Sequence, residues 1–543
     1  MKKIIAIVCI ISSMLLASVA VVPGENIRLT SDSNSILYVG GSGPGNYTRI
    51  QDAIDNASDG DTVFVYNGTY YERIVIKTSI NLIGEDKYVT IIDGRGESII
   101  SVGAEMVNIS GFSIRNSSQT LESDNGIYIS YGSNHTTIYN NIFSENGFGV
   151  ECLSKNNTFD KNYFISNGFG LALGGENNSV INNIFINDGV YLQPSSKIPN
   201  NFFNNNTVNG KPLIYLEDKS DTKINEAGQI ILISCEEITI KNISLSNTNL
   251  GIELINTNNC TINDNNLRNC ILGIVLSAYS ERNSLFNNNI EGCGAGIYLQ
   301  YRSDYNVIYN NKLCNISLSR FGININTTAI HLYIVDNNTF YGNDIINTKG
   351  IGISLSYYSD SHNCFYYNNF VNNTKNAYDP GNNIWYNPDT NKGNYWDDYE
   401  GIDANMDGIG DTPYNILGGN NQDLYPLVYN STDMIPPSIK ITKPEKGFYL
   451  FNNLIIKYSR FKPLIIGRIE IKANAIDNES GINHVEFYID NELKYNDTEY
   501  PYSYEWKKDK ILGSRQHTHT IKVVVYDNYG NSNYDEITVI KYL

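Results

Sequence analysis

The chain has few of the residues that bind soft metals, and it is short of positive charge. It contains six His, five Met and eight Cys among 543 residues, and the His and Met residues are not clustered. Soft-metal sites need several such side chains converging on one point, so the composition disfavours a copper-binding accessory protein. The formal net charge is −18 and the pI is near 4.8, which disfavours nucleic acid as a partner. A serine triad, a phosphate-binding loop and a Cys-X-X-Cys pair are also absent from the sequence.

Long apolar runs are missing as well, except at the N-terminus. Met1-Lys2-Lys3 is followed by the apolar run 4–16 and by small residues that end at Ala20. This layout predicts a secretory signal peptide over residues 1–20, with a retained membrane anchor as the alternative. We therefore expect a secreted or cell-surface protein whose mature chain does not insert into a membrane.

The strongest pattern in the sequence is a recurring asparagine. Each copy is followed two residues later by an apolar side chain, and another apolar residue stands five positions before that one. Successive copies are 21 or 23 residues apart where nothing is inserted, which is typical of solenoids. The eight copies are Asn141, Asn162, Asn183, Asn265, Asn288, Asn311, Asn343 and Asn368.

A second pattern follows each of these asparagines: a glycine, an apolar residue, any residue, and then usually Leu or Ile. Gly170-Leu-Ala-Leu, Gly251-Ile-Glu-Leu and Gly296-Ile-Tyr-Leu are examples. Alternating apolar residues bounded by Gly and Asn describe short strands with one face inward. We expect two such strands per coil, coils stacked in parallel, and one continuous apolar interior. The predicted fold is all-β, a parallel β-helix.

Asparagine suits the corners of such coils because its amide both donates and accepts hydrogen bonds, so a column of asparagines can satisfy itself. Cys270 and Cys293 occupy equivalent positions in successive coils, with backbones predicted to be about 5 Å apart. They are either a disulfide or two stacked thiols. Seven cysteines outside the signal segment do not fit a fully paired framework.

The chain divides into three parts. Residues 47–57 have the apolar spacing of a short helix, which we expect to cap the open end of a β-helix that spans residues 35–430. At Pro436-Pro437 the repeat stops. Residues 436–543 alternate apolar and polar residues in short runs, which predicts a separate β-sandwich.

Several segments resemble known families. Asp59–Ile76 and Thr90–Gly94 resemble the pectate-lyase-like right-handed β-helix superfamily, and more narrowly the NosD-like carbohydrate-binding and sugar-hydrolase repeat proteins. Asn206–Leu213 and Gly393–Tyr399, followed by Asp411-Thr-Pro-Tyr, resemble further marks of that family. The resemblance implies a right-handed β-helix, whereas activity stays open because the superfamily contains lyases, hydrolases, epimerases and binding proteins. The C-terminal part resembles Ig-like modules of prokaryotic surface proteins.

One segment resembles a calcium-binding loop. It places oxygen ligands at positions 1, 3, 5 and 9 with Gly at position 6, as an EF-hand loop does: Asp403, Asn405, Asp407 and Asp411. The twelfth position is Tyr414 rather than Glu, so another carboxylate would have to contribute, with Asp397 and Asp398 nearby. The alternatives are a structural Ca²⁺ site and an acidic turn without metal.

Alignment of the coils also exposes a column of acidic and aromatic residues after the glycine-bounded strand. Its members are Glu281, Asp304 and Asp360 in one slot, and Tyr301 and Tyr357 in another. A sugar chain lying along the axis could meet these carboxylates and rings, and paired carboxylates are also the apparatus of glycoside hydrolysis. The alternative is that these are ordinary solvated turns of a Tyr-rich chain.

We therefore expect a protein that binds a polysaccharide or a cell-surface glycan, with no assured catalysis. A polysaccharide lyase, hydrolase or epimerase is the first alternative, and a structural cell-envelope protein is the second. The set of acidic residues and histidine that a polygalacturonase needs does not occur in order. The sequence does not indicate the sugar, the anchor or the oligomeric state.

Overall fold

The computed structural model describes most of the chain beyond the N-terminal segment. The described residues are 34–117, 124–193, 200–317, 327–356, 362–405, 407–428, 436–458, 461–477, 482–507, 517–527 and 531–542. The predicted signal peptide and two of the predicted site residues, Tyr357 and Asp360, lie outside these ranges. One short helix, α1 (Ile50–Asp55), lies between the first two strands of the β-helix, and Ile50, Ala53 and Ile54 are buried in the same core as these strands.

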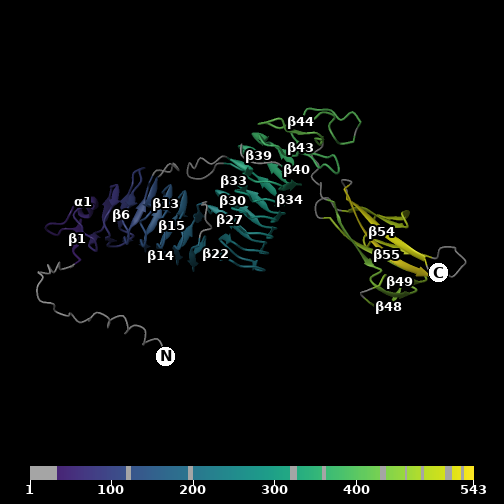
Figure 1. Cartoon of the computed structure of the whole chain (residues 1–543), viewed down its shortest axis with the longest axis horizontal. Helices are drawn as coiled ribbons and strands as arrows, with labels where there is room; N and C mark the ends of the chain where they lie inside the picture. The colour runs from purple at the N-terminus through teal and green to yellow at the C-terminus, as the bar shows by residue number, and fades with distance from the viewer. Residues whose placement is uncertain are drawn as a thin grey trace, which may run out of the picture.

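The first half of the described chain is a parallel β-helix with three strands per coil, which we call the N-terminal stack (Figure 1). Sheet A contains β1 (Ile36–Val39), β2 (Thr62–Val65), β5 (Asn81–Gly84), β8 (Asn108–Ser110), β11 (Thr137–Tyr139), β14 (Thr158–Asp160), β17 (Ser179–Ile181) and β20 (Phe202–Asn204). Sheet B contains β3 (Gly68–Tyr70), β6 (Thr90–Asp93), β9 (Ser113–Arg115), β12 (Ile142–Ser144), β15 (Tyr163–Ile165), β18 (Ile184–Ile186) and β21 (Thr207–Val208). Sheet C contains β4 (Ile74–Ile76), β7 (Ile100–Val102), β10 (Asn125–Ile129), β13 (Phe148–Cys152), β16 (Phe169–Leu173) and β19 (Val190–Leu192).

A second parallel β-helix, the C-terminal stack, follows. Sheet D contains β22 (Lys211–Glu217), β24 (Gln229–Ile233), β27 (Leu250–Ile255), β30 (Leu272–Ser277), β33 (Ala295–Gln300), β36 (Thr328–Tyr333), β39 (Ile351–Leu355) and β42 (Lys375–Tyr378). Sheet E contains β23 (Lys223–Ile224), β25 (Thr239–Lys241), β28 (Thr261–Asn263), β31 (Ser284–Phe286), β34 (Val307–Tyr309), β37 (Thr339–Tyr341) and β40 (Cys364–Tyr366). Sheet F contains β26 (Ser244–Ser246), β29 (Asn266–Arg268), β32 (Asn289–Glu291), β35 (Lys312–Cys314), β38 (Asp344–Ile346), β41 (Asn369–Val371) and β43 (Tyr395–Trp396).

The predicted parallel β-helix is confirmed, but each coil has three strands rather than two. The extra strand arises at the asparagine corner, because the residue just before the asparagine adopts a left-handed backbone. Asn140 has φ 55°, Asn287 has φ 54° and Tyr367 has φ 57°. A single left-handed residue turns the chain sharply, so what looked like one run of residues around each asparagine is two short strands in different sheets.

The recurring asparagines form buried hydrogen-bonded ladders, as their spacing predicted. All eight are at most 2% exposed. In the C-terminal stack the Nδ2 of Asn265 donates to Asn288, that of Asn288 to Asn311, and the ladder continues coil by coil to Asn394. It ends on Asp423, which accepts from Asn394 and from the Trp396 indole. A carboxylate suits this last position because it needs no further acceptor.

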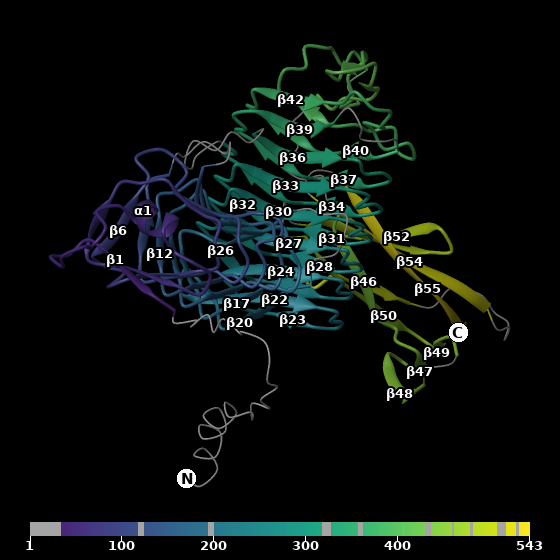
Figure 2. The same cartoon turned by 60° about the vertical axis from the view of Figure 1, so that its left-hand side comes forward.

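The two stacks meet at a tight hairpin that reverses the chain. Strands β21 and β22 pair antiparallel through Asn209 and Gly210, which have φ 49° and 78°. Positive φ at both central residues is the requirement of a type I′ turn, and Asn-Gly is its preferred sequence. After the reversal the coils stack in another direction, as two views show (Figures 1 and 2).

This reversal contradicts the expectation of one continuous interior, because the protein has two separate cores. Strand β24 forms part of the wall between them and is buried on both faces. Ile230 and Leu232 point into the core of the C-terminal stack, whereas Ile231 and Ile233 pack with the core of the N-terminal stack. The repeat pattern alone could not reveal this, because an inward apolar residue has the same signature in either stack.

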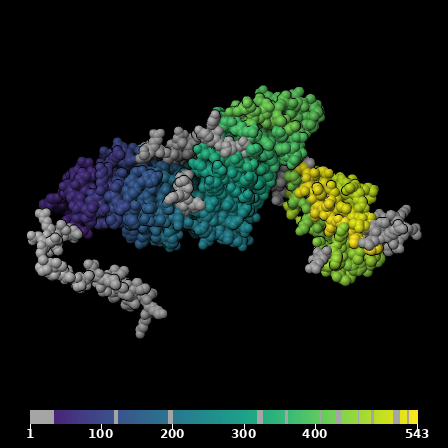
Figure 3. Space-filling model, viewed as in Figure 1, coloured from purple at the N-terminus to yellow at the C-terminus, as the bar shows by residue number. Residues whose placement is uncertain are grey.

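The last described part of the β-helix is an irregular cap with the small hairpin β44 (Tyr414–Asn415) and β45 (Gln422–Asp423). Beyond it lies an Ig-like β-sandwich of two sheets, which forms a separate lobe of the molecule (Figure 3). One sheet contains β46 (Ser438–Lys443), β50 (Ile469–Ile476) and β53 (Ser503–Trp506). The other contains β48 (Asn453–Lys457), β47 (Gly447–Leu450), β49 (Leu464–Ile466), β55 (Ser532–Tyr542), β54 (His517–Asp527), β51 (Ile482–Ile489) and β52 (Glu492–Asp497).

Candidate functional site

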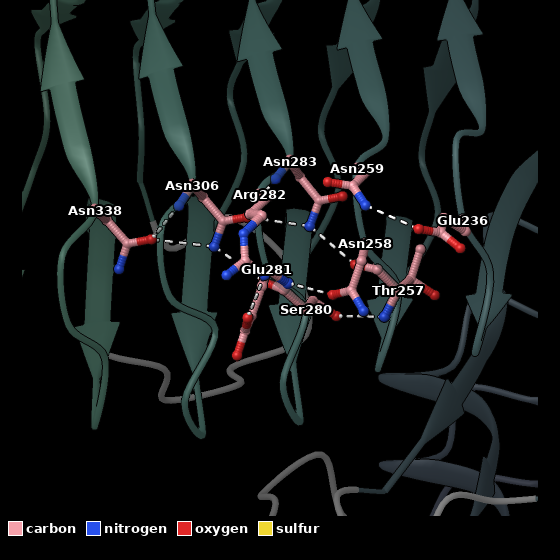
Figure 4. Close-up of polar contacts among 10 residues, drawn as sticks. All are labelled: Glu236, Thr257, Asn258, Asn259, Ser280, Glu281, Arg282, Asn283, Asn306 and Asn338. Carbon is pink, nitrogen blue, oxygen red and sulfur yellow. Dashed lines mark hydrogen bonds and ion pairs between the residues drawn. The ribbon is translucent and has the colours of Figure 1, made fainter.

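Two members of the predicted acidic column, Glu281 and Asp304, lie in the turns between sheets D and E, where their carboxylates have local partners. The Glu281 carboxylate pairs with Arg282 at 2.9 Å. It is directed away from a second asparagine ladder, in which Asn283 donates to Asn306 and Asn306 to Asn338 (Figure 4). The Asp304 carboxylate accepts a hydrogen bond of 2.7 Å from the backbone N–H of Asp336. The coils are adjacent, because the backbone N–H of Arg282 donates to the carbonyl of Asp304. Both carboxylates therefore hold turns together, and their part in sugar binding stays a prediction.

Tyr301 lies at the end of β33, on the side of the coil that faces the N-terminal stack. It has a left-handed backbone with φ 51°, and its side chain is 40% exposed. Its ring contacts Tyr333 of the next coil edge-on, with ring centroids 5.4 Å apart. Tyr301 also lies close enough to Tyr191 of the N-terminal stack to raise the pKa of that phenol. Tyr301 therefore begins the turn that also contains Asp304, and it lies at the end of that turn where the two stacks meet.

The region where the stacks meet, which we call the seam, joins the outer face of sheet C to the outer face of sheet D. Phe169 packs there with Leu250, Ile271 and Val275 in a small apolar cluster. Tyr191 and Tyr298 lie at its margin. Outer faces of a solenoid normally contact water, so the packing of two such faces leaves their remaining outward side chains in a partly dry corner.

Polar side chains of the C-terminal stack lock the seam. The Gln229 amide accepts from the backbone N–H of Val190 at 2.9 Å and donates to the carbonyl of the same residue. The Asn249 amide likewise accepts from Gly170 and donates to the carbonyl of Gly168. These bonds satisfy backbone groups on the last strand of sheet C, β19, and at the start of β16, the strand before it. The angle between the stacks is therefore set by specific bonds as well as by apolar contact.

One carboxyl group is buried at the seam. Glu253 occupies the outward position of β27 and is 3% exposed. Burial raises the pKa of Glu253 to about 8, and a hydrogen bond from the backbone of Leu192 offsets this effect in part. Among the described residues, its Oε2 has no hydrogen-bond partner. Glu253 is therefore mostly a neutral acid at pH 7.

Four tyrosines and a histidine surround this corner. Burial raises the pKa of Tyr191, and Glu253, Tyr298 and Tyr301 add to the effect. Burial, helped by Tyr301 and Tyr333, raises the pKa of Tyr298 to about 12. His331 stacks on Tyr298 with ring centroids 4.6 Å apart, and burial lowers the pKa of His331 to about 4. The seam cluster, defined as Tyr191, Glu253, Tyr298, Tyr301, His331 and Tyr333, therefore carries almost no charge at neutral pH.

Sequence reasoning found Tyr301 but missed most of this cluster. The signal was present in the glycine-bounded strands, because Glu253 and Tyr298 occupy the third position of Gly251-Ile-Glu-Leu and Gly296-Ile-Tyr-Leu. In register these residues form one outward column with Val275 and His331. An outward column is ordinarily exposed, so only the packing of Tyr191 against it identifies the column as a site.

The predicted calcium loop forms a tight acidic turn that bonds to its own backbone. The Asp403 carboxylate accepts from the N–H groups of Asp407 and Gly408 at 3.1 and 2.8 Å, and Asp411 accepts from Ala404 at 2.9 Å. Asn405 lies beside Asp407, to which its amide donates. Asp397 and Asp398, which we considered as additional ligands, instead accept from the side-chain amide of Asn376. A calcium site here stays a prediction.

The described residues also contain no group of three or more His, Cys, Asp or Glu side chains arranged to hold a metal ion. Cys270 and Cys293 are buried thiols that are not joined by a disulfide, so of the two alternatives the stacked thiols are observed. A hydrogen bond with Cys270, together with burial, holds the pKa of Cys293 well above its usual value.

Comparison with known proteins agrees with the fold. Residues 213–401 match the model of the family described as periplasmic copper-binding protein (NosD). Residues 78–227 match the right handed beta helix region, which agrees with the expected handedness, and residues 437–523 match the bacterial Ig domain. A search of curated proteins finds no match.

Among solved structures, three likenesses illustrate the range. The fibronectin(III)-like modules of Clostridium thermocellum CbhA are 26% identical, with 22% of this chain and 51% of that chain covered and a TM-score of 0.15. The alpha-1,3-glucanase catalytic unit from Streptomyces thermodiastaticus is 15% identical, with 62% and 65% covered and a TM-score of 0.29. The A-module of a mannuronan C-5 epimerase from Azotobacter vinelandii is 12% identical, with 62% and 92% covered and a TM-score of 0.23. Scores this low carry no argument about activity.

Across the described residues, no helix is long and apolar enough to cross a membrane.

Proposed function

We propose that this protein binds an uncharged, hydroxyl-rich polysaccharide at the seam between its two β-helix stacks, outside the cytoplasm. The observation that carries the proposal is the seam cluster. Tyrosine rings offer apolar faces for the C–H groups of a pyranose ring, and their hydroxyls bond to sugar hydroxyls. The proposed location outside the cytoplasm is supported by the matches to a periplasmic protein family and to the bacterial Ig domain.

The neutrality of the cluster supports an uncharged ligand rather than an acidic one. Glu253 has a pKa of about 8 and His331 one of about 4, so at pH 7 neither group carries much charge. Burial raises the pKa of Tyr191 and of Tyr298, so both phenols are neutral at this pH. An anionic sugar would lose its hydration at the seam, and none of these groups is a cation that could compensate for this loss. The net charge of −18 would also repel it.

The contacts give little support to the hydrolase alternative. Glycosidases use two carboxyl groups that face a common space. Glu281 is paired with Arg282, and Asp304 accepts a backbone N–H. Glu253 is too deeply buried to reach a sugar without movement of the seam. Binding without cleavage is therefore the simpler function for these residues.

The test uses the purified chain without residues 1–20 and a panel of neutral and acidic polysaccharides, with affinity gel electrophoresis and calorimetry as measurements. Tyr301→Ala removes an exposed ring at the seam, and we expect it to weaken binding about tenfold. Tyr305→Ala is the matched control. Tyr305 lies on the same coil, is 50% exposed and also has positive φ, but its ring contacts Arg282 in the turn to sheet E.

If Tyr301→Ala and Tyr305→Ala weaken polysaccharide binding equally, the site lies at the acidic turns and the proposed site at the seam is wrong. Tyr298→Phe adds a finer comparison, because it keeps the stacked ring and removes only the hydroxyl. Mass spectrometry of the incubated polysaccharides shows whether oligosaccharides are released. Release of products would replace binding by catalysis as the function, and the absence of binding to every polymer would leave a structural envelope role.

A further inference from the structure

A cavity lies in the Ig-like domain, at the open side of its sandwich. It lies between β52, an edge strand of the seven-stranded sheet, and β53, an edge strand of the three-stranded sheet. Its volume is about 540 Å³, within the ordinary range of ligand pockets. We call it the edge cleft, and its lining residues are Lys494, Tyr495, Ser503, Tyr504, Glu505, Trp506 and Lys507.

Aromatic side chains form one wall of the edge cleft. The rings of Tyr495 and Tyr504 come from the two different sheets and lie nearly parallel, with centroids 5.9 Å apart and an interplanar angle of 20°. Tyr495 is 47% exposed although it is aromatic. Two near-parallel tyrosines at a cavity present a surface on which a sugar ring can rest, with phenol groups at its edge for hydrogen bonds.

Trp506 supplies a hydrogen-bond donor that the described protein does not use. It is 2% exposed and lines the cleft, yet its Nε1–H has no hydrogen-bond partner among the described residues. Its ring is already in contact with the Lys541 ammonium, 4.5 Å from the centroid, and with the edge of His519. A buried indole N–H usually finds an acceptor, so an oxygen atom of a ligand is the natural partner here.

Basic side chains frame the same cleft. Lys494 and Lys507 both line it, against one lining carboxylate, Glu505. The lysines have exposed or half-exposed ion pairs, Lys494 with Glu492 at 2.8 Å and Lys507 with Glu505 at 3.2 Å. Pairs of this kind are weak and exchange readily for another anion. The cleft thus offers two ammonium groups that a ligand carboxylate could reach by displacing a glutamate, in a chain whose net charge is −18.

We propose that the edge cleft binds an acidic saccharide, such as a uronic acid unit. The sugar ring rests on Tyr495 and Tyr504, its carboxylate lies between Lys494 and Lys507, and an oxygen atom accepts the free N–H of Trp506. This site lies in a different domain from the seam, and it binds an acidic saccharide rather than an uncharged one. The protein would then hold a neutral polymer and an acidic one at the same time.

The cleft can be followed by tryptophan fluorescence on the whole chain. Of the three tryptophans, Trp385 and Trp396 are buried in the end of the C-terminal stack, and only Trp506 lines the cleft. We expect a galacturonate hexasaccharide to change the fluorescence in a saturable way and a neutral glucan hexasaccharide of equal length to leave it unchanged. Added salt should weaken the response, because exposed charges are screened.

Tyr495→Ala is expected to weaken hexagalacturonate binding about tenfold, and Lys494→Gln to weaken it about threefold. Tyr534→Ala is the matched control, since Tyr534 is 57% exposed in the same domain and does not line the cleft. Trp506→Phe should abolish the optical response, and calorimetry then measures the remaining affinity.

The proposal is overturned if the acidic hexasaccharide gives no response, if the neutral one binds equally well, or if Tyr534→Ala acts like Tyr495→Ala. Variants at Tyr301 should leave this titration unchanged. Failure here and failure at the seam are therefore distinguishable.

Discussion

The sharpest test of the fold compares two neighbouring asparagines, Asn288 and Asn289, each changed to alanine. Asn288 is 1% exposed and belongs to the buried ladder. Its Oδ1 accepts from the backbone N–H and the side chain of Asn265, and its Nδ2 donates to the carbonyl of Ile262 and to Asn311. Asn289 points outward, and its amide donates to Asn266 at 3.1 Å.

The magnitude follows from the groups that Asn288→Ala leaves without partners. The side chain of Asn265 keeps its bond to Ile240, and Oδ1 of Asn311 still accepts from the backbone of residue 288. The backbone N–H of Asn265 loses its acceptor, and the carbonyl of Ile262 loses its side-chain donor. At about 1–3 kcal/mol for each buried group, the loss is roughly 2–6 kcal/mol. Asn289→Ala should cost less than about 1 kcal/mol.

Urea denaturation followed by circular dichroism and by hydrogen exchange of the C-terminal stack gives both free energies of unfolding. Hydrogen exchange is needed because solenoids open region by region. Asn288→Asp sharpens the comparison, because its second oxygen would face two acceptors in mid-ladder, whereas the same carboxylate suits the ladder's end at Asp423. The reasoning is refuted if Asn288→Ala and Asn289→Ala differ by less than about 0.5 kcal/mol.

Three further predictions concern groups that the structure describes. Burial raises the pKa of Glu253 from 4.5 to about 8, so the folded state binds more protons than the unfolded state, and stability should fall as pH rises from about 5 through 8. Glu253→Gln should reduce the pH dependence of the melting temperature across this window. An unchanged pH dependence would contradict the assignment. If the acidic loop from Asp403 to Asp411 binds Ca²⁺, chelation should lower the melting temperature and speed proteolysis of this region, and no change in either would identify an acidic turn without metal. Cys270 and Cys293 should resist thiol reagents in the folded protein and react after denaturation, as counted by mass spectrometry; an intact mass showing a disulfide between them would contradict the free thiols.

Much of the β-helix could be predicted because its determinants are local and repeated. Every coil needs the same corner residue and the same inward apolar residue, so the signal accumulates along the chain. Two features escaped. The three-strand coil depends on single left-handed residues such as Asn140, and the type of residue at this position varies from coil to coil. The reversal at Asn209-Gly210 was visible as a turn sequence, but it was one Asn-Gly pair in an Asn-rich chain.

The candidate site was only partly within reach of the sequence. Tyr301 was identified together with Glu281 and Asp304, whose carboxylates bond within the turns to sheet E, and their common role stays a prediction. Tyr191 and Tyr298 are far apart in the chain and belong to different stacks, and no periodicity links them. Charge neutrality of the site was equally hidden, because it depends on burial at the seam.

The sequence by itself determined the parallel β-helix, its asparagine ladders and the Ig-like sandwich, because these depend on side-chain alternation, spacing and hydrogen-bonding capacity that are encoded residue by residue. Only the tertiary structure decided where function can reside. The packing of one outer face against another buries Glu253 and gathers the tyrosines, and the fold of the sandwich buries the Trp506 indole N–H with no acceptor among the described residues. Burial and orientation are properties of the folded molecule, and they set the pKa values and hydrogen-bonding partners of side chains whose identity alone is given by the sequence.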